Sequence, residues 1–314
     1  MTQDVSPCSP SGNSVGALIA GEGALPLLVA EYASRSGLQL TVYCLGDRSA
    51  YVGLCGVEAV PLPSCEGNDS DTRGGLDLRA TIQDMLRRRV GAVTLAGTVP
   101  KRMMYEARLD PSLRALLAGG NNDDHSLLGR IVGAFESAGL RVLPYTSYLA
   151  DSLAPEGHVA GRDPSDAEAA DIEYGRSVLS VTLPLSFGQS VVVAGGAVVA
   201  VEAMEGTDAM IRRAGELLGS RSGKAGVDVP VPATGGGVVV KMMRCDQDER
   251  YDVPVVGLST LETMRDAGVS CLAVEAGRTL LLHPETFRER AAMWRIAVVG
   301  ISGGSTPLSG GPRS

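Results

Sequence analysis

The chain has 314 residues, of which 44% are hydrophobic and only 4% aromatic, and its formal net charge is −8. This length predicts about two domains, with cores built mainly from aliphatic side chains. The acidic balance excludes a general nucleic-acid partner, because phosphate backbones bind to basic faces.

The first half of the chain alternates short apolar runs with amphipathic stretches. Because strands that alternate with helices form parallel sheets, this pattern predicts an α/β fold with a Rossmann-like, mostly parallel sheet over residues 14–145. Pro26 fits the first turn of a helix, and Gly37 fits its end. The expected strands are 15–20, 40–45, 92–96 and 140–143, and the expected helices are 26–36, 76–89, 110–118 and 126–138.

The second half, residues 146–301, predicts an α/β domain with a mixed sheet. Gly195-Gly196 joins two apolar runs and predicts an antiparallel hairpin. Two capping boxes are expected at helix starts, one from Ser165 and Glu168 and one from Ser259 and Glu262. The expected strands are 190–194, 197–203, 238–242, 271–274 and 296–299, and the expected helices are 166–179, 208–218, 259–267 and 284–293.

The ends of the chain and the cysteines bear on location. Residues 1–13 and 302–314 are rich in Ser, Gly and Pro, which predicts disordered tails. The six cysteines are scattered and form no C-x-x-C pair, which favours reduced thiols in a cytoplasmic protein. No apolar run reaches the roughly 18 residues that a membrane span needs, and residues 1–13 lack the basic start of a signal peptide.

The segment from Gln247 to Pro254 carries the most informative pattern. It places Asp248 and Asp252 four residues apart with Arg250 midway, directly after a strongly apolar run. Loops that follow strands commonly carry the chemistry of α/β proteins. The alternative is a solvated loop with salt bridges, but the mixed charge and Pro254 favour a functional loop.

A second acidic turn, Glu205-Gly206-Thr207-Asp208, follows another apolar run. Together with Glu202 it gathers carboxylates, which repel one another unless a cation or a base lies among them. Magnesium prefers carboxylate oxygens, so the two turns predict a metal-assisted site. The alternative is a turn followed by a helix cap.

Other segments leave two interpretations open. The turn at Gly21 and Gly23 precedes a helix and could contact a nucleotide phosphate, or it could be only a tight turn. Arg278 could grip a phosphate or lie in a surface hairpin. Residues 122–124, Asn-Asp-Asp, favour a helix cap over a carboxylate in a cleft.

Six segments in order resemble the LpxI-type UDP-2,3-diacylglucosamine pyrophosphatases over roughly residues 15–301. The EGTDAM and QDxRxDxP blocks are specific to that family, whereas the glycine turn is not. The segments are IAGEGALPLLVAE (19–31), NDDHSLL (122–128), GQSVVV (188–193), EAMEGTDAMIRRAGEL (202–217), VVVKMMRCDQDERYDVPVVG (238–257) and AVEAGRTLL (273–281).

The resemblance implies a magnesium-dependent enzyme of lipid A biosynthesis. It would split UDP-2,3-diacylglucosamine with water into UMP and 2,3-diacylglucosamine 1-phosphate (lipid X). The resemblance further implies a cytoplasmic protein that meets the inner face of the inner membrane through its lipid substrate, and a homodimer.

The expected roles follow from the motifs and the resemblance together. Asp248 is the first choice for the family's essential aspartate and Asp252 the second. We expect the site to lie between the domains, with an apolar groove for the acyl chains in the second domain. The catalytic and Mg²⁺-binding set is Asp208, Asp248 and Asp252, and the substrate-binding set is Gly21, Gly23, Gln189, Thr207, Lys241, Gln247, Arg250 and Arg278.

Two other functions stay open from the sequence alone. One is an NAD(P)-dependent oxidoreductase, suggested by the glycine turn and by Asp47 after the second strand. Pro26 stands where the third glycine of that motif would be, which counts against it. The other is a non-catalytic nucleotide-sugar binding protein.

Overall fold

The computed structural model describes residues 15–63, 77–98, 124–185, 188–221, 236–244 and 247–303. The chain folds as two compact units. One unit is Met1–Ala150 with Glu249–Tyr251, and the other is Asp151–Asp248 with Asp252–Ser314. The expected helix over 110–118 and the expected tails, apart from residues 302–303, lie outside the described residues.

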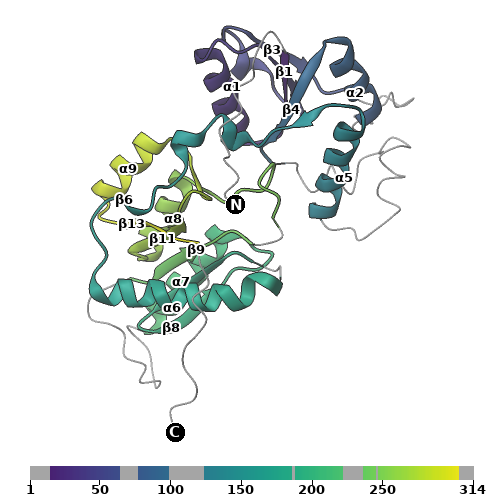
Figure 1. The fold of residues 1–314 in the computed structure, drawn as a ribbon. Coiled ribbons are helices and arrows are strands. Elements are labelled where there is room, and N and C mark those ends of the chain that lie inside the picture. The colour runs from purple at the N-terminus through teal and green to yellow at the C-terminus, as the bar shows by residue number, and fades with distance from the viewer. Residues whose placement is uncertain are drawn as a thin grey trace, which may run out of the picture. The chain divides into compact units, whose positions relative to one another are not determined.

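The N-terminal unit is a five-stranded sheet with helices on both faces (Figure 1). Its strands follow the order β3-β2-β1-β4-β5, and every described pair is parallel. This confirms the expected Rossmann-like, mostly parallel sheet. The elements are β1 (Val15–Ala20), α1 (Leu25–Arg35), β2 (Leu40–Cys44), η1 (Ser49–Tyr51), β3 (Val57–Pro61), α2 (Leu78–Arg87), β4 (Val90–Ala96), α5 (Asp124–Ser137), β5 (Arg141–Val142) and η2 (Tyr145–Ser147).

Alternation along the strands separates the two faces of this sheet. Ala17 packs with Met85 of α2 and with Phe135 of α5, whereas α1 covers the opposite face. Strand β3 was not predicted from the sequence. It is a short edge strand with half-exposed side chains, so it lacks the strongly apolar run that marks the central strands.

The C-terminal unit contains a six-stranded mixed sheet of order β6-β13-β11-β9-β7-β8. Strands β9, β11 and β13 are parallel, and β6, β7 and β8 pair antiparallel with their neighbours, which confirms the expected mixed sheet. The elements are η3 (Ala150–Ser152), β6 (Gly157–Ala160), α6 (Asp166–Thr182), η4 (Leu183–Leu185), β7 (Ser190–Ala194), β8 (Ala197–Val201), α7 (Thr207–Arg221), β9 (Val238–Lys241), β10 (Val255–Val256), α8 (Leu258–Ala267), β11 (Cys271–Glu275), β12 (Leu280–Leu281), α9 (Pro284–Met293) and β13 (Ala297–Ile301).

Helix α6 covers one face of this sheet, and α7, α8 and α9 cover the other (Figure 1). Val191 and Val240 pack on the α6 side, whereas Val192 and Val239 pack on the α7–α9 side. The fully buried pattern of β7 and β9 follows from this double coverage.

The structure confirms two local predictions, the hairpin at Gly195-Gly196 and the capping box at the start of α6. The capping box predicted at the start of α8 is wrong. Ser165 and Glu168 form the expected capping box of α6. The carboxylate of Asp171 accepts the backbone amides of Gly195 and Gly196 at 2.9 and 2.7 Å, which fixes the expected hairpin between β7 and β8.

The capping box expected from Ser259 and Glu262 is absent from α8. That helix begins one residue earlier, so Gly257 is its N-cap and provides no side chain to bond. Ser259 therefore lies within the first turn. None of the described helices is long and apolar enough to cross a membrane.

Candidate active site

The sheet order brings one end of three strands together in the C-terminal unit. Because β7 runs antiparallel to both β8 and β9, the start of β7 lies beside the ends of the other two. Ser190 is paired with Lys241, and Val191 with Val201. The Gly-Gln segment before β7, the acidic turn after β8 and the loop after β9 therefore meet at one edge of the sheet.

A buried chain of polar groups occupies this edge. The ammonium of Lys241 donates to Thr207 Oγ1 at 3.0 Å, and the Thr207 hydroxyl donates to Glu202 Oε1 at 2.9 Å. Lys241 is 5% exposed and Glu202 is 7% exposed. An acid and a base thus share the hydroxyl of one half-buried threonine, which makes each charge tolerable in the interior.

The ammonium of Lys241 interacts electrostatically with carboxylates of both acidic turns. Burial lowers the pKa of Lys241 below its ordinary value, and the charges of Glu202, Asp208 and Asp252 oppose that shift, in that order of size. The clustered carboxylates therefore have a base among them, Lys241, whereas the sequence predicted a magnesium ion at these turns.

The glycine before Gln189 has a structural reason. A β-carbon on Gly188 would lie 2.0 Å from the backbone oxygen of Glu202, so only glycine permits this approach. The backbone amide of Gln189 then points to Glu202 Oε2 at 3.4 Å. The side-chain oxygen of Gln189 is buried and has no hydrogen-bond partner among the described residues.

The loop after β9 is braced by the side chain of Gln247. Its oxygen accepts the backbone amide of Arg244 at 2.7 Å, and its nitrogen donates to Asp252 Oδ2 at 3.0 Å. The backbone amide of Asp252 also donates to the carbonyl of Asp248 at 2.9 Å. Gln247 was predicted to bind substrate, but both polar ends of its amide are used inside the loop.

Glu275, at the end of β11, ties down the start of the same loop. One of its oxygens accepts the backbone amide of Met243 at 2.8 Å, and the other lies 3.5 Å from the guanidinium of Arg278. The neighbouring ends of β9 and β11 are thereby connected by a buried carboxylate. Arg278 is half-exposed beside this carboxylate.

The middle of the loop belongs to the N-terminal unit. Arg250 forms an ion pair with Glu136 of α5 at 2.6 Å, and Tyr251 packs against the core of that unit. Arg250 was predicted to bind phosphate; the structure pairs it with Glu136, and a contact with phosphate stays a prediction.

Gly21 and Gly23 lie in the N-terminal unit after β1. A β-carbon on Gly21 would lie 2.7 Å from the backbone oxygen of Thr98, so packing between the ends of β1 and β4 accounts for this glycine. Gly23 has a φ of +98°, and no described residue lies within 4 Å of the position that its β-carbon would take. For Gly21 the tight-turn interpretation is therefore sufficient, and a nucleotide contact at this turn stays a prediction.

The carboxylate of Asp47 is used inside its own turn. It accepts both the backbone amide and the hydroxyl of Ser49, and these hydrogen bonds lower the pKa of Asp47. A ribose-binding role for Asp47 thus has no geometric support.

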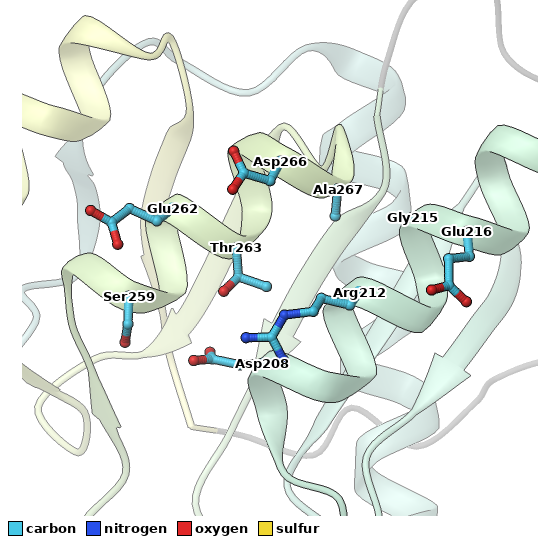
Figure 2. A pocket seen from close by; sticks show the side chains of 9 residues that line it. All are labelled: Asp208, Arg212, Gly215, Glu216, Ser259, Glu262, Thr263, Asp266 and Ala267. Atoms are coloured by element: carbon cyan, nitrogen blue, oxygen red, sulfur yellow. The ribbon is translucent and has the colours of Figure 1, made fainter.

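Asp208 lines a pocket of about 660 Å³ between α7 and α8. In Figure 2 the side chains of Asp208 and Arg212 both project into this space, and further carboxylates surround it. The charged lining does not suit acyl chains, and the expected apolar groove stays a prediction. The lining residues are Asp208, Arg212, Gly215, Glu216, Ser259, Glu262, Thr263, Asp266 and Ala267.

The three carboxylates expected to hold magnesium do not form a preformed site. Within the described parts of the chain, no group of three or more His, Cys, Asp or Glu side chains is arranged to hold a metal ion. Asp208 and Asp252 both act on the charge of Lys241 without forming such a group. The described residues therefore do not fit a three-carboxylate metal centre.

Two residues of this edge were not among the predicted site residues. Glu202 and Glu275 are buried carboxylates that each follow or end an apolar strand. An acid in that position is a usable signal, because a carboxylate is rarely buried without a partner.

Comparisons with known proteins now decide the family. The model described as the LpxI N-terminal domain matches residues 67–152, and the model described as the LpxI C-terminal domain matches residues 155–299. The chain belongs to the LpxI family. The second match covers every residue of the polar edge described above.

One relative agrees with this membership. The chain is 28% identical over 288 residues to the UDP-2,3-diacylglucosamine pyrophosphatase LpxI of Caulobacter vibrioides, covering 90% of this chain and 96% of that protein. It also aligns with the crystal structure of the L-amino acid ligase from Bacillus licheniformis at 17% identity and a TM-score of 0.25, over 62% of this chain and 40% of that one. A likeness at that TM-score supports no conclusion.

Proposed function

We propose that this LpxI-family chain hydrolyses the pyrophosphate bond of UDP-2,3-diacylglucosamine. The products would be UMP and 2,3-diacylglucosamine 1-phosphate, in lipid A biosynthesis. Family membership over both domains and the relative from Caulobacter vibrioides support this substrate. The observation that carries the proposal is the hydrogen bond between buried Lys241 and Thr207 beside the Asp248–Asp252 loop.

The polar edge supplies the groups that a diphosphate needs. Lys241 and Thr207 present a cation and a hydroxyl at the first turn of α7, where backbone amides also favour anions. They would bind phosphate oxygens and offset the charge that builds up as the bond breaks.

Asp248 would orient the attacking water and accept its proton. The bond between one phosphorus and the bridging oxygen breaks, and that oxygen leaves with the other phosphate. Attack at either phosphorus gives the same two products. Gln247 would keep Asp252 and the loop in register through its two hydrogen bonds.

Magnesium stays a separate proposal. A magnesium ion bound mainly through substrate phosphates needs only one or two carboxylates from the protein. The residues named above act on the substrate and the water, and a bound magnesium ion would add neutralisation of charge at the phosphates. We also propose a cytoplasmic location with contact to the inner membrane through the lipid, and a homodimer.

The test is incubation of the purified chain with UDP-2,3-diacylglucosamine, with and without Mg²⁺, with UMP and the lipid phosphate measured in parallel. The expected result is release of both products in equal amounts. Binding of the substrate without turnover would instead favour a nucleotide-sugar binding protein. Binding of NAD(P)H in a titration, without UMP release, would favour the oxidoreductase.

The matched variant for this assay is Asp248→Asn, which keeps the shape of the side chain and removes its charge. We expect it to abolish product formation and to leave a cooperative thermal transition. Full activity of Asp248→Asn would exclude Asp248 as the residue that activates water.

A further inference from the structure

Glu202 is a buried carboxylate whose hydrogen bonds all point toward the polar edge of the C-terminal sheet. Its Oε1 accepts the Thr207 hydroxyl at 2.9 Å, and its Oε2 faces the backbone amide of Gln189 at 3.4 Å. Thr207 in turn accepts the ammonium of Lys241. Glu202 therefore fixes which way the Thr207 hydroxyl points, and leaves its lone pairs for Lys241.

A second observation indicates that this edge is built for a ligand. Ser190 lies directly opposite Lys241 in an antiparallel ladder, so both side chains project from the same face of the sheet. That face is the one covered by α7. The hydroxyl oxygen of Ser190 is fully buried, and it has no hydrogen-bond partner among the described residues.

The Lys241 ammonium has more donors than the described residues use. An ammonium has three N–H donors, and Thr207 is its hydrogen-bond partner within the described part of the chain. Buried donors and acceptors are normally satisfied, so the unused N–H groups and the Ser190 hydroxyl together fit an incoming oxygen atom. An anionic oxygen suits both the cation and the first turn of α7.

We propose that Glu202 is the positioning residue of this oxygen site: through Thr207 it aims the ammonium of Lys241 at a phosphate oxygen of the diphosphate. Glu202 itself does not touch the substrate. This inference rests on the proposed function, since the diphosphate is the ligand that the site would take. It assigns a role to Glu202, the buried acid that follows β8, and the sequence of the two acidic turns does not indicate this role.

Substitution of Glu202 by glutamine distinguishes a loss of positioning, measured by kcat, from a loss of stability, measured by the melting temperature. Glu202→Gln keeps the volume of the side chain but removes the charge that orients Thr207. We expect kcat for UMP release to fall about 10- to 100-fold, because a small misplacement of a binding group has effects of that size. KM should change much less, and the melting temperature should fall no more than in the control.

The matched control is Glu168→Gln, which removes the charge of another buried glutamate of the same unit. Glu168 is 4% exposed and pairs with Arg162, away from the polar edge. This variant should lower the melting temperature and leave kcat unchanged. A loss of kcat in the control equal to that in Glu202→Gln would overturn the inference, since the loss would then come from general destabilisation.

A double-mutant cycle with Thr207 tests the proposed route and does not depend on one variant. Thr207→Ser keeps the hydroxyl and should retain most activity, whereas Thr207→Val should lose about as much as Glu202→Gln. If Glu202 acts through Thr207, the double variant should be no slower than Thr207→Val alone. Fully additive losses would overturn the inference, as would normal activity of Glu202→Gln.

The two levels of proposal fail in different ways. A wild-type chain that releases no UMP in the presence of Mg²⁺ overturns the proposed function, and the role of Glu202 falls with it. An active wild type with an unaffected Glu202→Gln variant overturns only the positioning role.

Discussion

The side-chain nitrogen of Gln247 lies 3.0 Å from Oδ2 of Asp252 and donates a hydrogen bond to it. The other end of the same amide accepts the backbone N–H of Arg244. One nearly buried amide thus closes the loop that carries Asp248, which accounts for a glutamine at this position without any contact to substrate.

We predict that Gln247→Leu lowers kcat by about 10- to 100-fold while the chain still folds. Leucine has a similar size but leaves the Arg244 amide and the Asp252 carboxylate without this partner, at about 1–3 kcal/mol of stability. Rates of UMP release and urea unfolding curves measure the two effects. Gln83→Leu, on the exposed face of α2, is the control and should keep full activity; equal rates for wild type and Gln247→Leu would contradict the prediction.

Removal of divalent cations should stop turnover and leave the fold intact. Magnesium is expected to enter mainly with the substrate phosphates, because the described residues form no preformed metal centre. Activity is measured in excess chelator and after titration with Mg²⁺, and the melting temperature is measured in parallel without substrate. A large rise in melting temperature on adding Mg²⁺ alone would indicate a metal site in the free protein, against this prediction.

Two glycines in the middle of helices should respond oppositely to alanine. A β-carbon on Gly175 of α6 would lie 2.5 Å from Cγ2 of Val240, so Gly175→Ala should lower stability by about 1–3 kcal/mol. Among the described residues, nothing lies within 4 Å of the same position on Gly133 of α5, so Gly133→Ala should raise stability by about 0.5–1 kcal/mol. The melting temperature of each variant, compared with that of wild type, measures the two effects. A Gly175→Ala variant more stable than wild type would contradict the prediction and would show that α6 can move away from the sheet.

Acid should weaken the C-terminal unit through Glu168. Burial alone would raise the pKa of this carboxyl, but hydrogen bonds from Arg162, Ser270 and Ser165 outweigh burial and lower the pKa to about 2. Because the folded pKa is depressed, the stabilisation is present above the unfolded value of about 4.5 and is lost as pH falls from there toward 2.

Urea unfolding at pH 7 and pH 3 measures this contribution. The loss of stability between the two pH values should be smaller in Glu168→Gln than in wild type by about 2 kcal/mol. The same pH dependence in both proteins would show that the ion pair with Arg162 does not control the acid response.

Most helices and central strands could be predicted from the sequence, because the signals for them are local. The hairpin at Gly195-Gly196 and the capping box at Ser165 depend on residues only a few positions apart. The edge strands β3 and β6 were missed, because an edge strand is stabilised by its neighbour and carries little apolar signal of its own.

The sequence by itself determined the alternating α/β pattern, the family motifs and the two acidic turns at Thr207 and Asp252. Only the tertiary structure decided which side chains of those turns contact one another and the neighbouring strands. The antiparallel placement of β7 between β8 and β9 brings Glu202, Thr207 and Lys241 into contact across 39 positions of sequence, from 202 to 241. Such a contact depends on strand order, and strand order results from packing of the whole sheet and leaves no local pattern in the chain.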